Sequence, residues 1–137
     1  MYLIVTRSFP PEPGGMQNLM WGLAKEMSKN FMIKVFADYQ DNHKEFDKNQ
    51  NFSIERIGGI KFLRKIRKAQ LVNEFLKQNK VNGIIADHWK SFESIKTNEN
   101  KFCLIHGKEI NHSKGSSQNK RLLGILNNVH KVIANSE

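Results

Sequence analysis

Three short stretches of the sequence combine residue types that can bind a polar ligand, and each follows a mainly apolar run. The first is the segment 7–15, which contains three prolines and two glycines. Prolines stiffen a loop, and Gly14 and Gly15 let a ligand approach the backbone just before a helix whose free amides suit a phosphate or a sugar hydroxyl. A simple tight turn explains the same two glycines. The spacing fits neither a dinucleotide-binding fingerprint nor a phosphate-binding P-loop.

The second stretch is Asp87-His88-Trp89, directly after the run 81–86. It brings together an acid, an imidazole and a large flat ring, and the ring of Trp89 can stack on the face of a sugar. A structural interpretation is equally well supported. In that case Trp89 packs as a lid over the edge of a sheet, and Asp87 caps the helix that follows.

The third stretch is His106-Gly107-Lys108-Glu109, directly after the apolar run 102–105. A neutral histidine can donate or accept a hydrogen bond at physiological pH, and Gly107 permits an unusual backbone turn. A histidine in this place can also serve the structure alone. No metal site is expected, because the histidines lack the spacing of zinc ligands and Cys103 is the only cysteine.

The elements that must position these residues alternate between strands and helices. Apolar runs predict strands at 2–6, 32–37, 52–57, 81–87, 101–106 and 131–134, and helical periodicity predicts helices at 16–27, 61–78 and 120–129. The polar stretch 38–51 is expected to be a loop, and 90–100 to hold two helical turns. Strands that are apolar throughout indicate a buried parallel sheet. We therefore expect a single α/β domain over 1–137, a doubly wound, mainly parallel Rossmann-like sheet with helices on both faces. In such a sheet ligands bind at the carboxyl ends of the strands.

The chain is strongly basic, with a formal net charge of +9, which makes phosphate-rich ligands, nucleic acid and anionic membranes all plausible partners. The one dense basic block lies at 60–68, where apolar and cationic residues are interleaved. Its apolar residues lie on more than one side, which favours a helix buried between sheet and solvent. The alternative is a helix that docks on an anionic bilayer. One cysteine and the lack of a membrane-spanning stretch favour a cytoplasmic protein, at most peripheral at the inner face of the membrane.

Taken in order, these motifs resemble the amino-terminal domain of glycosyltransferase family four, a retaining family of the two-Rossmann-domain (GT-B) type. The segments that carry the resemblance are Phe9-Pro10-Pro11 with Gly14-Gly15, Leu23-Ala24-Lys25-Glu26-Met27, Asp87-His88, His106-Gly107-Lys108-Glu109 and Val132-Ile133-Ala134-Asn135-Ser136. The resemblance covers the whole chain. Each motif alone is weak, but their order and separations together are fairly specific.

The resemblance implies an enzyme that transfers a sugar from a nucleoside diphosphate to a glycan or lipid-linked acceptor, in the synthesis of cell-envelope polysaccharides, without a metal or other cofactor. It implies that Gly14 and Gly15 lie near the donor diphosphate and the acceptor, and that His106 contacts the transferred sugar as the catalytic candidate. Asp87, His88 and Glu109 are further candidates for donor or acceptor binding. A second, carboxyl-terminal domain would bind the nucleotide sugar, so we expect the chain by itself to be inactive.

Other functions remain open on the sequence. The chain can be an accessory half-subunit that pairs with a separately encoded second half. An epimerase or a phosphorylase on the same scaffold is a further alternative. Nucleic-acid binding is not expected, because no aromatic-basic strand motif or recognition helix is evident.

Overall fold

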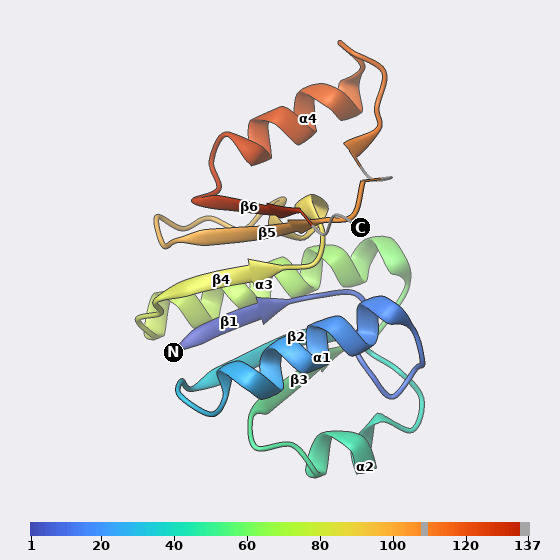
Figure 1. Cartoon of the computed structure of the whole chain (residues 1–137), viewed down its shortest axis with the longest axis vertical. Coiled ribbons are helices and arrows are strands. Elements are labelled where there is room, and N and C mark those ends of the chain that lie inside the picture. Colours follow the sequence, from blue (N-terminus) through green and yellow to red (C-terminus); the bar gives the residue numbers. More distant parts are fainter. Residues whose placement is uncertain (108–109, 135–137) are drawn as a thin grey trace.

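Six parallel strands form the centre of the molecule in a computed structural model that describes residues 1–107 and 110–134 (Figure 1). The strands lie in the order β3-β2-β1-β4-β5-β6, and every neighbouring pair is parallel. Their bounds are β1 (Tyr2–Val5), β2 (Ile33–Asp38), β3 (Ser53–Ile57), β4 (Gly83–Ala86), β5 (Lys101–Ile105) and β6 (Lys131–Ala134). The predicted α/β class and parallel sheet are confirmed.

The order of the strands creates a switch point between β1 and β4. The chain begins at the centre of the sheet, moves outward through β2 to β3, and then crosses back to β4 and moves outward in the other direction. Tyr2 pairs with Ile33 of β2 on one side and with Gly83 of β4 on the other. The connections after β1 and β4 therefore leave the sheet in opposite directions, and such a point opens a crevice at the carboxyl ends of the strands.

Helices cover both faces of the sheet, because alternate residues of each strand point to opposite faces. Ile4 of β1 contributes to a core that includes Met20 and Ala24, whereas Leu3 belongs to a second core with Val72. The first face carries α1 (Gly15–Met27) and α2 (His43–Lys48), and the second carries α3 (Lys61–Gln78), the 3-10 turn η1 (Trp89–Phe92) and α4 (Ser117–Leu126). The predicted helices on both faces are thus confirmed.

Helix α3 has the predicted bounds but not the predicted burial. Its later turns pack on the sheet through Ala69 and Val72, which are buried. In contrast, the apolar residues at its start are exposed: Ile60 by 70%, Phe62 by 71%, Leu63 by 55% and Ile66 by 40%. The expectation of a helix buried between sheet and solvent therefore holds for the later turns of α3 and not for its start, because the start lies at the end of the sheet toward which the strands point (Figure 1).

Two polar segments also differ from the prediction. The stretch 38–51 contains α2, a helix too short to show periodicity, which is held by an edge contact between Phe46 and Phe9 and by an ion pair of Asp47 with Arg56. The stretch after β4 holds the single turn η1 at its start rather than two helical turns. Helix α4 begins earlier than expected because the Ser116 hydroxyl accepts a hydrogen bond from the Asn119 amide and caps it.

Glu93, at the end of η1, joins the elements of the second face. Its carboxylate pairs with Lys65 of α3 and accepts a hydrogen bond from Arg121 Nε of α4 at 2.9 Å. Burial acts to raise the pKa of Glu93, but the hydrogen bonds and positive charges of Lys65 and Arg121 outweigh it and hold that pKa below its usual value. The ionised carboxylate therefore stabilises the packing of η1 between the two helices.

We expect Glu93→Gln to lower the free energy of unfolding by about 1 kcal/mol at pH 7, because the partners of this carboxylate are partly exposed. A carboxyl group with a lowered pKa in the folded state contributes stability above its unfolded pKa, and loses it as pH falls through the folded value. The difference in free energy of unfolding between the unchanged chain and Glu93→Gln, measured with urea, should therefore become smaller below pH 4.5. Glu74→Gln, which removes an exposed carboxylate of α3, is the control. A difference that does not change with pH would contradict this account.

Candidate functional site

The structure brings the predicted site residues to one edge of the sheet. Gly14 and Gly15 follow β1, Asp87 and His88 follow β4, and His106 follows β5. Because β1, β4 and β5 are neighbouring parallel strands, their carboxyl ends lie side by side. Glu109, the remaining predicted site residue, lies outside the described residues.

The glycine pair leaves the start of α1 open. Gly14 has an extended backbone with φ 162°, and Gly15 does not adopt the left-handed conformation, so a tight turn does not require either glycine. A Cβ atom at Gly15 would meet no other atom within 4 Å. The N-cap residue, Gly14, has no side chain that could cap the first turn of α1, and the side-chain amide of Gln17 lies against Gly14. No side chain at Gly15 obstructs a ligand, and the flexible side chain of Gln17 must move aside for a ligand to reach the amides of this helix start.

Asp87 is a buried residue whose hydrogen bonds connect the ends of β1 and β4. Only 3% of it is exposed, and its carboxylate accepts hydrogen bonds from Thr6 Oγ1 at 2.6 Å, the Arg7 amide at 3.1 Å and Ser91 Oγ at 3.2 Å. These partners come from the segments that follow β1 and β4 and from η1. The carboxylate thus orients the loops of the switch point.

His88 and Trp89 serve the local structure. The Nδ1 atom of His88 accepts a hydrogen bond from the Lys90 amide at 3.0 Å and caps η1. Trp89 is fully buried and packs at right angles to the ring of His112, with 6.0 Å between the ring centroids. Of the two interpretations of this tryptophan, packing is confirmed, because a buried ring offers no face to a sugar.

His106 lies directly after β5 and is half-buried. The residue that follows, Gly107, has φ 88°, a left-handed conformation that glycine adopts without strain. The unusual backbone turn predicted at Gly107 is confirmed. His106 itself lies at the carboxyl edge of the sheet, directly after the last residue of β5.

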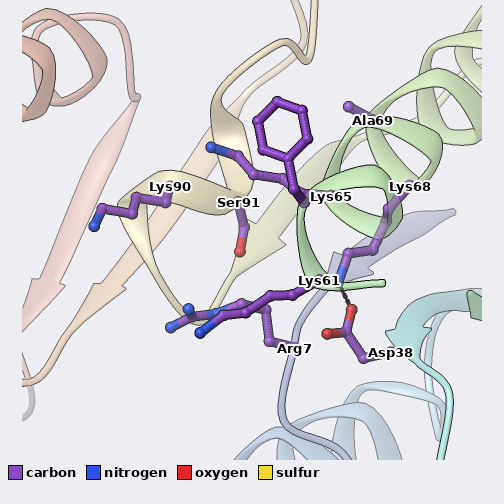
Figure 2. A pocket seen from close by; sticks show the side chains of 9 residues that line it. Arg7, Asp38, Lys61, Lys65, Lys68, Ala69, Lys90 and Ser91 are labelled. Carbon is purple, nitrogen blue, oxygen red and sulfur yellow. Dashed lines mark hydrogen bonds and ion pairs between the residues drawn. The ribbon is translucent and has the colours of Figure 1, made fainter. Parts of the chain in front are cut away.

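A basic cavity of about 420 Å³, which no local sequence pattern predicts, lies at the same edge. It is formed by the start of α3, the ends of β1 and β2, and η1 (Figure 2). The residues that line it are Arg7, Asp38, Lys61, Phe62, Lys65, Lys68, Ala69, Lys90 and Ser91. Figure 2 shows the nitrogen ends of Arg7 and Lys61 on the same side of the cavity, the side chain of Lys90 extending away from them, and Lys68 pointing to Asp38.

The cavity has more positive than negative charge. Lys65 and Lys68 pair with Glu93 and Asp38. Arg7, Lys61 and Lys90, in contrast, form no ion pair with any carboxylate within residues 1–107 and 110–134. Helix α3 begins in the cavity wall, with no acidic residue in its first turn and no side-chain cap. Its free amides add to the positive potential, so the cavity suits an anion such as a phosphate group.

A buried network below the cavity holds α3 against the sheet. The Nζ atom of Lys68 donates hydrogen bonds to the Thr6 carbonyl at 2.6 Å and to Asp38, and the other oxygen of Asp38 lies 3.1 Å from Nε of Arg64. Burial lowers the pKa of Lys68, and the charges of Asp38 and Asp87 offset part of that effect. Helix α3 is thereby connected to the ends of β1 and β2.

Comparisons with known proteins add no family. A scan against models of protein families and a search of curated proteins both give no match. In the part of the chain that the structure describes, no three His, Cys, Asp or Glu side chains gather where they could hold a metal ion. Across the same residues, no helix is long and apolar enough to cross a membrane.

We expect Lys68→Met to lower the free energy of unfolding by about 2–4 kcal/mol, because it removes the cation from a buried pair and leaves the Thr6 carbonyl without its donor. Lys77→Met, an exposed lysine of the same helix, is the control. In the double variant Lys68→Met with Asp38→Asn, the loss should be smaller than the sum of the two single losses, since the two residues interact directly. Urea unfolding of the unchanged chain and of the four variants measures these losses. Equal effects of Lys68→Met and Lys77→Met would contradict the role given to this network.

Proposed function

We propose that this chain is the acceptor-side half of a retaining glycosyltransferase of the two-Rossmann-domain type. One observation carries the proposal. The open helix start at Gly15, the imidazole of His106 and the basic cavity share the carboxyl edge of one parallel sheet, around its switch point. Ligands of parallel sheets bind at such an edge. The order of the motifs along the chain, which resembles that of family-four glycosyltransferases, supplies the reaction.

In the proposed reaction, the bond between the anomeric carbon of the sugar and the donor diphosphate breaks, and a bond to an acceptor hydroxyl forms on the same face. The hydroxyl proton passes to the departing diphosphate. This chain contributes position and charge: the free amides at the start of α1 lie toward the diphosphate, and His106 hydrogen-bonds the transferred sugar. A second Rossmann-like domain holds the nucleotide.

The basic cavity extends the proposal to the acceptor. If the second domain holds the donor nucleotide, then the uncompensated charges of Arg7, Lys61 and Lys90 on this half are available to the acceptor. We therefore infer that the acceptor carries a phosphate group, as a lipid-linked or phosphorylated glycan does. The cavity would hold that phosphate and place the acceptor hydroxyl near His106.

Calorimetric titration of the isolated chain tests the division of labour between the halves. We expect UDP-glucose and GDP-mannose to bind weakly or not at all, with dissociation constants above about 1 mM, because the nucleotide contacts belong to the second domain. Tight binding of either donor to this chain alone would contradict the proposal.

Sugar transfer in the presence of the second domain tests the site itself. With radiolabelled donor and a lipid-linked acceptor, His106→Gln should lower kcat/KM by about 100-fold, since a contact made in the transition state is lost. His130→Gln is the matched control, because His130 precedes β6 at the opposite edge of the sheet. Transfer that is insensitive to His106→Gln, or equally sensitive to both changes, would exclude this assignment.

A further inference from the structure

We propose that the first turns of α3, together with Arg7 and Lys90, form a docking surface for an anionic phospholipid bilayer. The surface consists of an apolar ridge, Phe62, Leu63 and Ile66 with Ile60 just before the helix, and of a group of cations around it. This proposal does not depend on the sugar-transfer reaction proposed above, although both use the charges of the same cavity. It rests on exposure, helix geometry and charge, and its test measures no sugar transfer.

The ridge continues the packed side of α3 toward the start of the helix. At about 100° per residue, Phe62, Leu63 and Ile66 fall within an arc of about 100°, and Ala69, which is buried against the sheet, lies about 20° from Phe62. The ridge is exposed because the first turns of α3 lie at the end of the sheet toward which the strands point (Figure 1). An exposed patch of this kind on a helix that is otherwise packed indicates a surface that another body covers.

The positive charge around the ridge favours an anionic bilayer as the partner that covers it. The segment 60–73 contains five cations and no carboxylate, the first acidic residue after it being Glu74. Within the described residues, Lys61 and Arg67 of this segment form no ion pair, and neither do Arg7 and Lys90 nearby. Exposed apolar side chains bordered by uncompensated cations match the acyl and phosphate layers of an anionic leaflet.

The basic cavity gives this surface a place for a headgroup. Phe62 lies in the cavity lining with Arg7, Lys61 and Lys90, and the residue is 71% exposed. A phospholipid phosphate in the cavity can contact the three cations, while its acyl chains lie beside Phe62 and the rest of the ridge. One site therefore receives both parts of the lipid.

Vesicle sedimentation with the whole chain tests the proposal. We expect the protein to bind vesicles made from equal parts of phosphatidylcholine and phosphatidylglycerol, and not vesicles of phosphatidylcholine alone. The ridge variant, Phe62→Ser with Leu63→Ser and Ile66→Ser, and the cation variant, Arg7→Gln with Lys61→Gln and Lys90→Gln, should each weaken binding by about tenfold or more.

The control is Lys44→Gln with Lys48→Gln and Lys80→Gln, which removes the same charge from exposed positions elsewhere and should leave vesicle binding nearly unchanged. Circular dichroism is measured for every variant, so that a loss of vesicle binding can be told from a loss of folding.

Three outcomes of the sedimentation would overturn the proposal: no binding to the mixed vesicles, equal binding to both kinds of vesicle, or equal losses in the control and cation variants. The first would leave a partner protein as the occupant of the ridge. Adding inorganic phosphate at matched ionic strength tests whether the cavity binds a soluble phosphate rather than a lipid headgroup. If phosphate displaces the protein from vesicles while the ridge variant binds normally, the cavity takes a soluble phosphate, and the docking proposal is wrong.

Discussion

The arrangement of the carboxyl edge depends on one buried ammonium group. Lys68 lies in the middle of α3, is 4% exposed, and can remain charged only because the Thr6 carbonyl and Asp38 accept its hydrogen bonds. A rotation of α3 about its axis would bury this charge without acceptors, which is far more costly than the loss of an apolar contact. The network therefore fixes the orientation of α3 on the sheet. It also joins the ends of β1 and β2, and through Thr6 and Asp87 the end of β4.

The orientation of α3 determines where the chain exposes its apolar and cationic residues. With Lys68 directed to the strand ends, Ala69 and Val72 face the core, while Phe62, Leu63 and Ile66 lie in the first turns, at the end of the sheet, and stay exposed. The start of the helix is thereby set beside Arg7 and Lys90, which come from two other connections. The same ion pair that orients the helix thus also creates the basic cavity. The cavity is a product of the fold rather than of any single segment.

This dependence explains which parts of the structure the sequence predicts. The strands and the bounds of α3 follow from local periodicity, and the parallel sheet follows from their alternation and apolar character. Local periodicity predicts less well which side of each helix faces the core. The block at 60–68 has apolar residues on two sides, and only the buried Lys68, a residue type expected at the surface, decides which side packs.

The candidate site shows the same limit. Reasoning from strand ends places Gly15, Asp87 and His106 at a common edge, and the parallel sheet brings them there. It does not distinguish a carboxylate held by protein groups, as in Asp87, from one that is open to a ligand. The cavity combines residues from four separate segments of the chain, so no local sequence pattern predicts it. A signal did exist, since Arg7, Asp38 and Lys90 each lie at or just after the end of a strand in the crevice of the switch point.

The burial of Trp89 gives the molecule an intrinsic optical probe. The chain has two tryptophans, and they lie on opposite faces of the sheet. Trp89 is covered by Lys90, whose ammonium lies 5.1 Å from the ring centroid and whose side chain also lines the cavity. Trp21 is held on the other face by a hydrogen bond from its Nε1 atom to Gln50 at 2.9 Å. An anion that draws Lys90 away from the indole would alter the emission of Trp89 alone, with Trp21 as a built-in reference.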